Sequence, residues 1–189
     1  MKIDQSWTLF LDRDGVINKR IPGDYVRNRQ QFSFLDGSLE AIAQLNYIFG
    51  LIVVVTNQQG IGKGLMTQTE VDKVHTYLMV KVEEVGGCIE HVYTCPALAE
   101  DNSICRKPNP GMALQAKEDF PLIDFSRSVM VGDSISDMEF GINLGMKTVF
   151  IETKMDIDSS KIPVVDYRFS SLRDFARTFQ LVNVGLIDS

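Results

Sequence analysis

Two acidic residues at the end of an apolar run are the first feature of this 189-residue chain that could carry out chemistry. Residues 7–11 predict a buried strand. Asp12 and Asp14 follow it, and Gly15 allows the chain to turn sharply. Side chains along a strand alternate, so both carboxylates can face the same way. An isolated pair is explained by a solvated strand end, whereas a buried pair needs a divalent cation, or a reaction in which one acid attacks and the other carries a proton.

Three further polar residues stand near predicted strand ends or a helix start. Residues 51–55 predict a central parallel strand that ends at Thr56, and residues 128–131 predict another that leads to Asp133. Because parallel strands place their carboxyl ends on one edge of a sheet, we expect Asp12, Thr56 and Asp133 to lie close together. Lys107 precedes a predicted helix whose first turn could face the same edge.

Acids, a hydroxyl group and a lysine in one place suit phosphoryl transfer. The carboxylates would hold Mg²⁺, which prefers oxygen ligands in octahedral geometry. Thr56 and Lys107 would bind the phosphoryl oxygens and neutralise the charge that develops during transfer. One aspartate would then be free to act as the nucleophile.

The order of the predicted elements is typical of an α/β protein. Residues 89–94, 148–151 and 164–169 predict further strands. The predicted helices occupy residues 36–50, 67–85 (with Thr67 in a capping box), 111–120 (with Asn109 as N-cap), a stretch after Asp133 that ends near Gly145, and a stretch that begins near Ser171. This alternation predicts a single α/β domain over residues 1–189, built on a doubly wound, mostly parallel sheet.

The composition favours one cellular compartment and argues against two classes of binding partner. No apolar run approaches the length of a membrane span, and residues 1–6 lack the apolar core of a signal peptide. A net charge of −6 argues against general nucleic-acid binding, which requires a basic face. We therefore expect a cytoplasmic protein with neither a membrane nor a nucleic-acid partner.

Cysteine usage adds an expectation about redox state. The three cysteines, Cys88, Cys95 and Cys105, form an odd set without the spacing of a disulfide framework. Because a cytoplasmic compartment keeps thiols reduced, we expect three free thiols.

Four segments match the signatures of a known superfamily. In order along residues 7–151 they are Asp12-Arg13-Asp14-Gly15, Thr56 after Val53-Val54-Val55, Lys107-Pro108, and Gly132-Asp133-Ser134-Ile135-Ser136-Asp137. With these segments the chain resembles the haloacid dehalogenase (HAD) superfamily of phosphatases. The resemblance implies a Rossmann-like sheet and a hydrolase that cleaves a phosphomonoester through an aspartyl-phosphate intermediate.

The resemblance also implies a role for each aspartate. Asp12 would be the nucleophile, and Asp14 would be the general acid/base. Asp12, the main-chain carbonyl of Asp14 and Asp133 would hold Mg²⁺ as the cofactor. Asp137 would support the metal side of the site, while the alternative for Asp137 is an acid favoured near a helix N-terminus by the helix dipole alone.

Longer matches at residues 12–18, 56–61 and 105–112 look like the group that holds heptose bisphosphate phosphatases and histidinol phosphatases. This closer resemblance implies phosphate binding by Thr56, Asn57 and Lys107 and substrate binding by Arg106 and Gln58. The planar fork of Arg106 suits a second phosphate. The implied substrate is a small phosphorylated sugar of carbohydrate metabolism, D-glycero-D-manno-heptose 1,7-bisphosphate, with histidinol phosphate as the alternative.

Many HAD members insert a cap domain, and this chain leaves no room for one. Residues 15–37 are too few for a folded insert, and one helix, one strand and a loop fill the stretch between Thr56 and Lys107. We therefore expect a capless enzyme in which the loops at residues 19–31, 57–66 and 95–106 set specificity.

The chain departs from its group at one point. The group usually carries a structural zinc site made of Cys-Pro-His and Cys-x-Cys, whereas this chain reads Cys95-Pro96-Ala97 and Ser103-Ile104-Cys105. Structural zinc needs four nitrogen or sulfur ligands, and two are missing here. We expect Mg²⁺ and no structural zinc.

Two other classes of function compete with the phosphatase of a small sugar phosphate. One is an inactive HAD-fold interaction protein, against which the intact acids and lysine argue. The other is a phosphatase of nucleic-acid ends, against which the acidic charge argues. The sequence predicts no particular oligomeric state.

Overall fold

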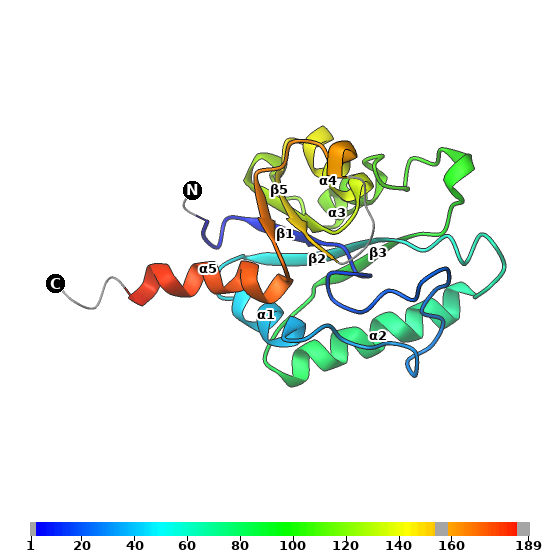
Figure 1. The fold of residues 1–189 in the computed structure, drawn as a ribbon, viewed down its shortest axis with the longest axis horizontal. Coiled ribbons are helices and arrows are strands. Elements are labelled where there is room, and N and C mark those ends of the chain that lie inside the picture. The colour runs from blue at the N-terminus through cyan, green and yellow to red at the C-terminus, as the bar shows by residue number, and fades with distance from the viewer. Residues whose placement is uncertain (1–2, 154–158, 185–189) are drawn as a thin grey trace.

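The computed structural model describes residues 3–153 and 159–184, which form a six-stranded sheet with helices on both faces (Figure 1). The strands are β1 (Thr8–Leu11), β2 (Leu51–Asn57), β3 (His91–Cys95), β4 (Ser128–Gly132), β5 (Lys147–Ile151) and β6 (Tyr167–Phe169). Their order across the sheet is β3-β2-β1-β4-β5-β6, and every neighbouring pair is parallel. The predicted doubly wound α/β fold is confirmed.

Five α-helices cover the two faces of this sheet in the described part of the chain. They are α1 (Ser38–Leu45), α2 (Gln68–Glu84), α3 (Gly111–Asp119), α4 (Ile135–Asn143) and α5 (Leu172–Val184). Helices α1, α2 and α5 lie on one face, and α3 and α4 lie on the other (Figure 1). Short 3₁₀ turns occupy Ala99–Asp101, Phe125–Arg127 and Ser159–Lys161.

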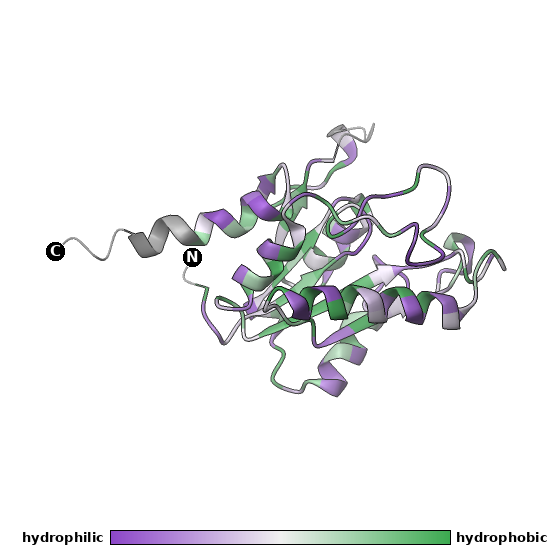
Figure 2. Ribbon diagram, turned by 90° about the horizontal axis from the view of Figure 1, so that it is seen from below, coloured by the Kyte–Doolittle hydropathy of each residue, from purple (hydrophilic) through white to green (hydrophobic). Residues whose placement is uncertain are grey.

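The sheet separates two apolar cores, and β1 contributes to both of them. Leu9 and Leu11 pack among residues of α1, α2 and α5, whereas Phe10 packs with Val53 on the side of α3 and α4. Strands buried on both faces must be apolar at every position, which explains the unbroken hydrophobic runs of the sequence. Figure 2 shows this arrangement as hydrophobic strands between helices with hydrophilic outer positions.

Two predicted helix boundaries are wrong. The first predicted helix ends at Leu45 instead of reaching Gly50, because turns follow in which Tyr47 and Ile48 donate to carbonyl groups only three residues earlier. Asn109 is not the N-cap of α3, since Pro110 occupies that position. The side chain of Asn109 instead donates to the main-chain oxygen of Ser103 at 2.9 Å, within a preceding tight turn.

No cap domain interrupts the part of the chain that the structure describes. Between β1 and α1 the chain forms a loop with only isolated bridges, at Asp14–Asn18 and Asn18–Phe34. The loops at residues 19–31, 57–66 and 95–106 gather at the carboxyl end of the strands, as Figure 1 shows. Across the described ranges, no helix has both the length and the apolar character needed to cross a membrane.

The capping box of α2 gives a test of the fold. The Thr67 hydroxyl accepts from the Glu70 main chain at 3.2 Å, and the Glu70 carboxylate accepts from the Thr67 main chain at 2.7 Å. We expect Thr67→Ala to lower the free energy of unfolding by about 1 kcal/mol, because a helix N-cap is lost. Urea unfolding at neutral pH measures the change. Thr67→Ser is the matched control that keeps the hydroxyl, and equal losses for both variants would contradict the role of the cap.

Candidate active site

The site lies at the point where the sheet reverses its winding order. From β1 the chain crosses to β2 on one side, and β4 lies on the other side of β1. A crevice is expected there in an open α/β sheet. Asp12 directly follows β1, Asp133 directly follows β4, and the main-chain nitrogen of Asp12 donates to the Val131 oxygen at 2.9 Å. The structure therefore brings together the strand-end acids that the sequence predicted to converge.

The turn after Asp14 requires a glycine. Gly15 adopts a φ of 94°, which side-chain-bearing residues rarely adopt. A Cβ atom at this position would lie 1.8 Å from the Oδ2 atom of Asp133. Gly15 therefore lets the loop from β1 approach the acid from β4 closely.

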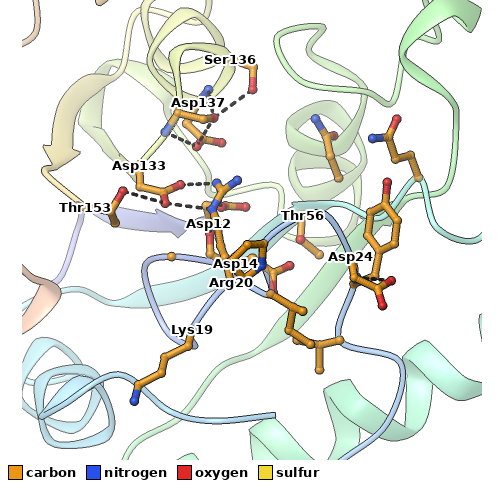
Figure 3. A pocket seen from close by; sticks show the side chains of 18 of the residues that line it. Asp12, Asp14, Lys19, Arg20, Asp24, Thr56, Asp133, Ser136, Asp137 and Thr153 are labelled. Atoms are coloured by element: carbon orange, nitrogen blue, oxygen red, sulfur yellow. Dashed lines mark hydrogen bonds and ion pairs between the residues drawn. The ribbon is translucent and has the colours of Figure 1, made fainter. Parts of the chain in front are cut away.

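Three buried carboxylates form the centre of the site (Figure 3). Oxygen atoms of Asp12, Asp133 and Asp137 all lie within 4.8 Å of one another. Burial, with the neighbouring charge of Asp137, raises the pKa of Asp12 to about 6. Burial also raises the pKa of Asp133 to about 7, against the opposing effect of Arg20. So much negative charge away from water requires cations beside it.

Lys107 supplies one of these cations. Its buried Nζ atom donates to Asp12 Oδ1 at 2.8 Å and to the main-chain oxygen of Val55 at 2.6 Å, and it lies 2.6 Å from Asp137 Oδ1. Burial alone would lower the pKa of Lys107, but the charges of Asp12 and Asp137 outweigh it and raise the pKa. The side-chain amide of Asn57 makes two hydrogen bonds with the main chain of Lys107. Its Nδ2 atom donates to the Lys107 oxygen at 3.2 Å, and its Oδ1 atom accepts from the Lys107 nitrogen at 3.1 Å. Asn57 therefore fixes the segment that carries the lysine.

Arg20 supplies the second cation. Its Nε atom donates at 2.9 Å to both Asp133 Oδ2 and the main-chain oxygen of Asp14. Its Nη2 atom pairs with Asp133 Oδ1 and lies 3.7 Å from Asp12 Oδ2. These are the three groups that the sequence predicted to hold Mg²⁺. The guanidinium thus stands where a cation fits, among oxygen atoms of the kind that Mg²⁺ prefers.

Asp14 lies at the edge of this cluster and has a different environment. Its carboxylate accepts from Arg13 Nη2 at 3.0 and 2.8 Å, from Asn18 Nδ2 at 2.8 Å and from Gln58 Nε2 at 2.8 Å. Burial would raise the pKa of Asp14, but the Arg13 charge and these hydrogen bonds outweigh it, so the pKa lies below its usual value. The pKa values of the two acids that follow β1 are therefore shifted in opposite directions, upward for Asp12 and downward for Asp14.

Gln58, which the sequence predicted to bind substrate, is engaged by two active-site residues in the structure. Gln58 is buried and does not line the cavity described below. Its Nε2 atom donates to Asp14 Oδ2 and to the Thr56 hydroxyl, both at 2.8 Å. Because this amide bridges Asp14 and Thr56, it holds both side chains in place, and Thr56 still lines the cavity.

Asp137 combines the two interpretations that the sequence left open. It closes a capping box at the start of α4, where the Ser134 main-chain nitrogen donates to Asp137 Oδ2 at 3.0 Å. Its other oxygen forms the ion pair with Lys107. One carboxylate therefore serves the helix and the acid cluster.

A cavity of about 860 Å³ opens beside the acids. It is lined by the acid cluster, by much of the loop at residues 19–26, and by Lys63 and Arg106. Arg106 Nη1 donates to the Ala97 oxygen at 3.1 Å, and Lys63 Nζ contacts the Tyr25 hydroxyl at 3.2 Å. The cavity is larger than a single phosphate requires, and Lys63 and Arg106 add basic side chains to its lining.

The expectation of three free thiols is wrong for two of them. Cys95 and Cys105 form a disulfide, with their Cα atoms 5.4 Å apart, and Cys88 is the free cysteine of the described residues. Cys95 ends β3, and the loop folds back so that Cys105 reaches it. Linear spacing does not report such proximity. The bridge ties β3 to the segment that carries Arg106 and Lys107.

Sequence reasoning missed the central position of Arg20 and the contacts of Arg13. Arg20 was one of four basic residues in its loop, and no pattern separates it from the other three. Arg13 is fully buried, although arginine is mostly exposed in proteins. A buried arginine between two acids of a strand end gives no sequence signal of its own.

Comparisons with known proteins agree with this geometry. A family profile described as HAD-hydrolase-like matches residues 104–161. The D-glycero-alpha-D-manno-heptose-1,7-bisphosphate 7-phosphatase of Mycobacterium bovis is 40% identical over 170 residues, which cover 90% of each chain. The D-glycero-beta-D-manno-heptose-1,7-bisphosphate 7-phosphatase of Pasteurella multocida is 35% identical over 89% of this chain and 94% of that protein.

A solved structure has the same architecture. The D,D-heptose 1,7-bisphosphate phosphatase of B. bronchiseptica, crystallised with magnesium and phosphate, superposes with a TM-score of 0.82 at 26% identity. The match covers 93% of this chain and 99% of that one. The chain belongs to the family of HAD-like phosphatases, as the sequence motifs predicted.

The position of Arg20 generates a prediction about metal binding. A cation that binds Asp133 must displace the Arg20 guanidinium, at the loss of charged hydrogen bonds worth about 1.5–3 kcal/mol. We expect Arg20→Ala to bind Mg²⁺ about tenfold more tightly, as measured by isothermal titration calorimetry on metal-free protein. Arg27→Ala is the control, because Arg27 pairs with Asp24 in the same loop. Unchanged or weaker Mg²⁺ binding by Arg20→Ala would refute the competition.

Proposed function

We propose that this chain is a Mg²⁺-dependent phosphatase that removes the 7-phosphate of a D-glycero-D-manno-heptose 1,7-bisphosphate through an aspartyl phosphate on Asp12. The observation that carries the proposal is the buried Asp12 carboxylate, which lies 2.8 Å from Lys107 Nζ and lines a cavity together with further basic residues. A carboxylate beside fixed cations is suited to attack on a phosphoryl group, whose negative charge those cations neutralise.

Asp12 attacks the phosphorus, and the bond from phosphorus to the sugar oxygen breaks. Asp12 must be ionised for this step, and Lys107 favours its ionised form. Lys107 and Thr56 hold the oxygens of the transferred group. Asn57 acts indirectly, since its side chain holds the Lys107 main chain.

Asp14 handles the proton in both half-reactions. It gives a proton to the departing sugar oxygen, and then takes a proton from the water that attacks the aspartyl phosphate and breaks its bond to Asp12. The contacts with Arg13, Asn18 and Gln58 hold the pKa of Asp14 below its usual value. The negative charge of a bound phosphate raises that pKa and favours the protonated form that the first step needs.

Asp12, the Asp14 main-chain oxygen and Asp133 would hold Mg²⁺, with Asp137 supporting Lys107 beside them. The ion would neutralise charge between the phosphoryl group and the attacking carboxylate. Arg20 must leave these three groups when the ion binds, and its exposed position at the cavity allows it to turn toward the substrate.

The second phosphate of the substrate would be held by Arg106. Arg106 and Lys107 are neighbours in the chain and both line the cavity, where Lys107 contacts the acids and Arg106 donates to the Ala97 main chain. Lys63 adds a further positive charge there. Histidinol phosphate, which has one phosphate, is the alternative substrate and would leave this basic side of the cavity without an anion.

We propose the cytoplasm as the compartment and a small phosphorylated sugar as the partner, without nucleic-acid or membrane association. The net charge of −6 supports the absence of nucleic acid. We also propose that residues 1–189 act as a single domain, since one sheet spans the described strands.

Variants of the two acids test the mechanism. We expect Asp12→Asn to abolish turnover, because the nucleophile is gone. Asp14→Asn should lower kcat by about 10²–10⁴-fold, the usual range for loss of a general acid/base. Steady-state phosphate release measures both, and circular dichroism controls for folding. Normal turnover by a folded Asp12→Asn variant would exclude Asp12 as the nucleophile.

Metal analysis tests the cofactor proposal. We propose that the protein holds no structural zinc, because Cys95 and Cys105 bond to each other and Ala97 and Ser103 replace the other two ligands. A chelator should therefore stop turnover and leave the thermal unfolding midpoint of the zinc-free fold largely unchanged, with Mg²⁺ restoring activity. One tightly bound zinc per chain in elemental analysis would show that this loop was misinterpreted.

Removal of the Arg106 side chain tests the substrate. Arg106→Ala should cost a heptose bisphosphate about 1.5–3 kcal/mol in kcat/KM more than it costs a monophosphate, because a charged hydrogen bond is lost only with the former. Arg127→Ala, an exposed arginine outside the cavity, is the control. Equal losses with both substrates would favour histidinol phosphate over the bisphosphate.

A further inference from the structure

A buried chain of three side chains runs from helix α2 to the edge of the catalytic centre. His75 lies on α2, and Arg13 lies in the turn after β1. Arg13 Nη1 is 2.9 Å from His75 Nε2, and Arg13 Nη2 contacts both Asp14 oxygens. His75 is 6% exposed and Arg13 is fully buried. Residues far apart in the sequence are thus joined through one guanidinium.

The chemistry of arginine fixes the direction of the first contact. A guanidinium has only donors, so Nε2 of His75 must accept, and the imidazole is neutral with its proton on Nδ1. Burial and the Arg13 charge lower the pKa of His75 to about 3, which agrees with a neutral ring. A neutral acceptor holds Arg13 in place without cancelling its positive charge.

The environment leaves Arg13 few substitutes for His75. Its Nε atom has no hydrogen-bond partner within the described residues, and the ring of Phe32 lies 6.0 Å from its guanidinium carbon. Loss of His75 would leave a second buried nitrogen unpaired, which favours rotation of the guanidinium. Rotation would release the fork that orients the Asp14 carboxylate.

We propose that His75 is a positioning residue that holds Arg13 against Asp14 and so fixes the group that moves the proton in both half-reactions. This inference rests on the proposed function, because it requires an Asp14 that works in both steps. His75 is not among the residues that line the active-site cavity, so it would act through Arg13 and Asp14.

The two half-reactions provide a readout that a merely structural role would not move. An alkyl phosphate needs a proton on its leaving oxygen, whereas p-nitrophenyl phosphate releases a stable anion without one. A misplaced Asp14 therefore slows both steps with a sugar phosphate, but chiefly slows the second step with p-nitrophenyl phosphate. In the second case the aspartyl phosphate accumulates.

The experiment compares His75→Phe, His75→Gln and His91→Phe with the wild-type protein by rapid acid quench and steady-state turnover. His91, the other histidine of the chain, is exposed on β3 and is the matched control. We expect His75→Phe to lower kcat for heptose bisphosphate about 10²-fold, within the range of a displaced acid/base. With p-nitrophenyl phosphate the same variant should accumulate phosphoenzyme. His75→Gln, whose amide oxygen can accept from Arg13, should restore most of the rate. If His75→Phe does not fold, the rate of His75→Gln relative to the wild type still tests the role of His75.

Three results would overturn the inference. They are wild-type rates in His75→Phe, equal losses with both substrates without accumulation of phosphoenzyme, and a folded His75→Gln variant that is as slow as folded His75→Phe. Failure of the proposed function looks different, since the wild-type protein itself would then not turn over heptose bisphosphate. If the wild-type protein is active and the His75 variants are unaffected, the inference about His75 fails while the proposed function stands.

Discussion

The burial of negative charge at the carboxyl edge of the sheet is the constraint on which the rest of the structure depends. Asp12 and Asp133 are almost completely removed from water, and burial raises the pKa of both. Carboxylates in such a place are tolerated only beside fixed cations. Lys107 and Arg20 provide them, and each comes from a loop that passes over the edge of the sheet. The order of the strands, with β1 beside β4, brings the acids together in the first place.

The same contacts link stability to function. In the proposed reaction, a metal ion would bind the groups that Arg20 contacts, and the phosphoryl group would lie beside Lys107. Metal binding as proposed would therefore be an exchange, in which Arg20 would give up Asp133 and the Asp14 main-chain oxygen while Lys107 stays beside Asp12. Asp14 is held by Arg13, Asn18 and Gln58, and none of these three neighbours lines the cavity. Preorganisation of this kind is what phosphoryl transfer requires from a protein.

Sequence alone predicted those features that depend on local pattern and on sheet topology. The unbroken apolar runs predicted the central strands, the Thr67 capping box was confirmed, and parallel pairing placed Asp12 near Asp133. Contacts that long side chains make across loops could not be predicted from the sequence. Arg20 could enter the acid cluster only because of the path that its loop takes, and the amide of Gln58 turned inward toward Asp14.

The remaining misses have the same origin. The bridge between Cys95 and Cys105 depends on a Cα separation that spacing along the chain does not encode. The contact between His75 and Arg13 joins residues 62 positions apart. Asn109 had the right residue type for an N-cap, but its side chain forms a hydrogen bond with the Ser103 main chain in the preceding turn instead. In each case tertiary structure decided among options that the local sequence left open.

The central claim is that the buried acid at the end of β1 accepts the phosphoryl group. Rapid acid quench of the wild-type protein with substrate and Mg²⁺, followed by peptide mapping, tests it most directly. We predict a phosphoryl group on the carboxylate of Asp12, formed before free phosphate appears and lost as turnover ends. Turnover without any phosphorylated residue, or a phosphoryl group trapped on a residue other than Asp12, would contradict it.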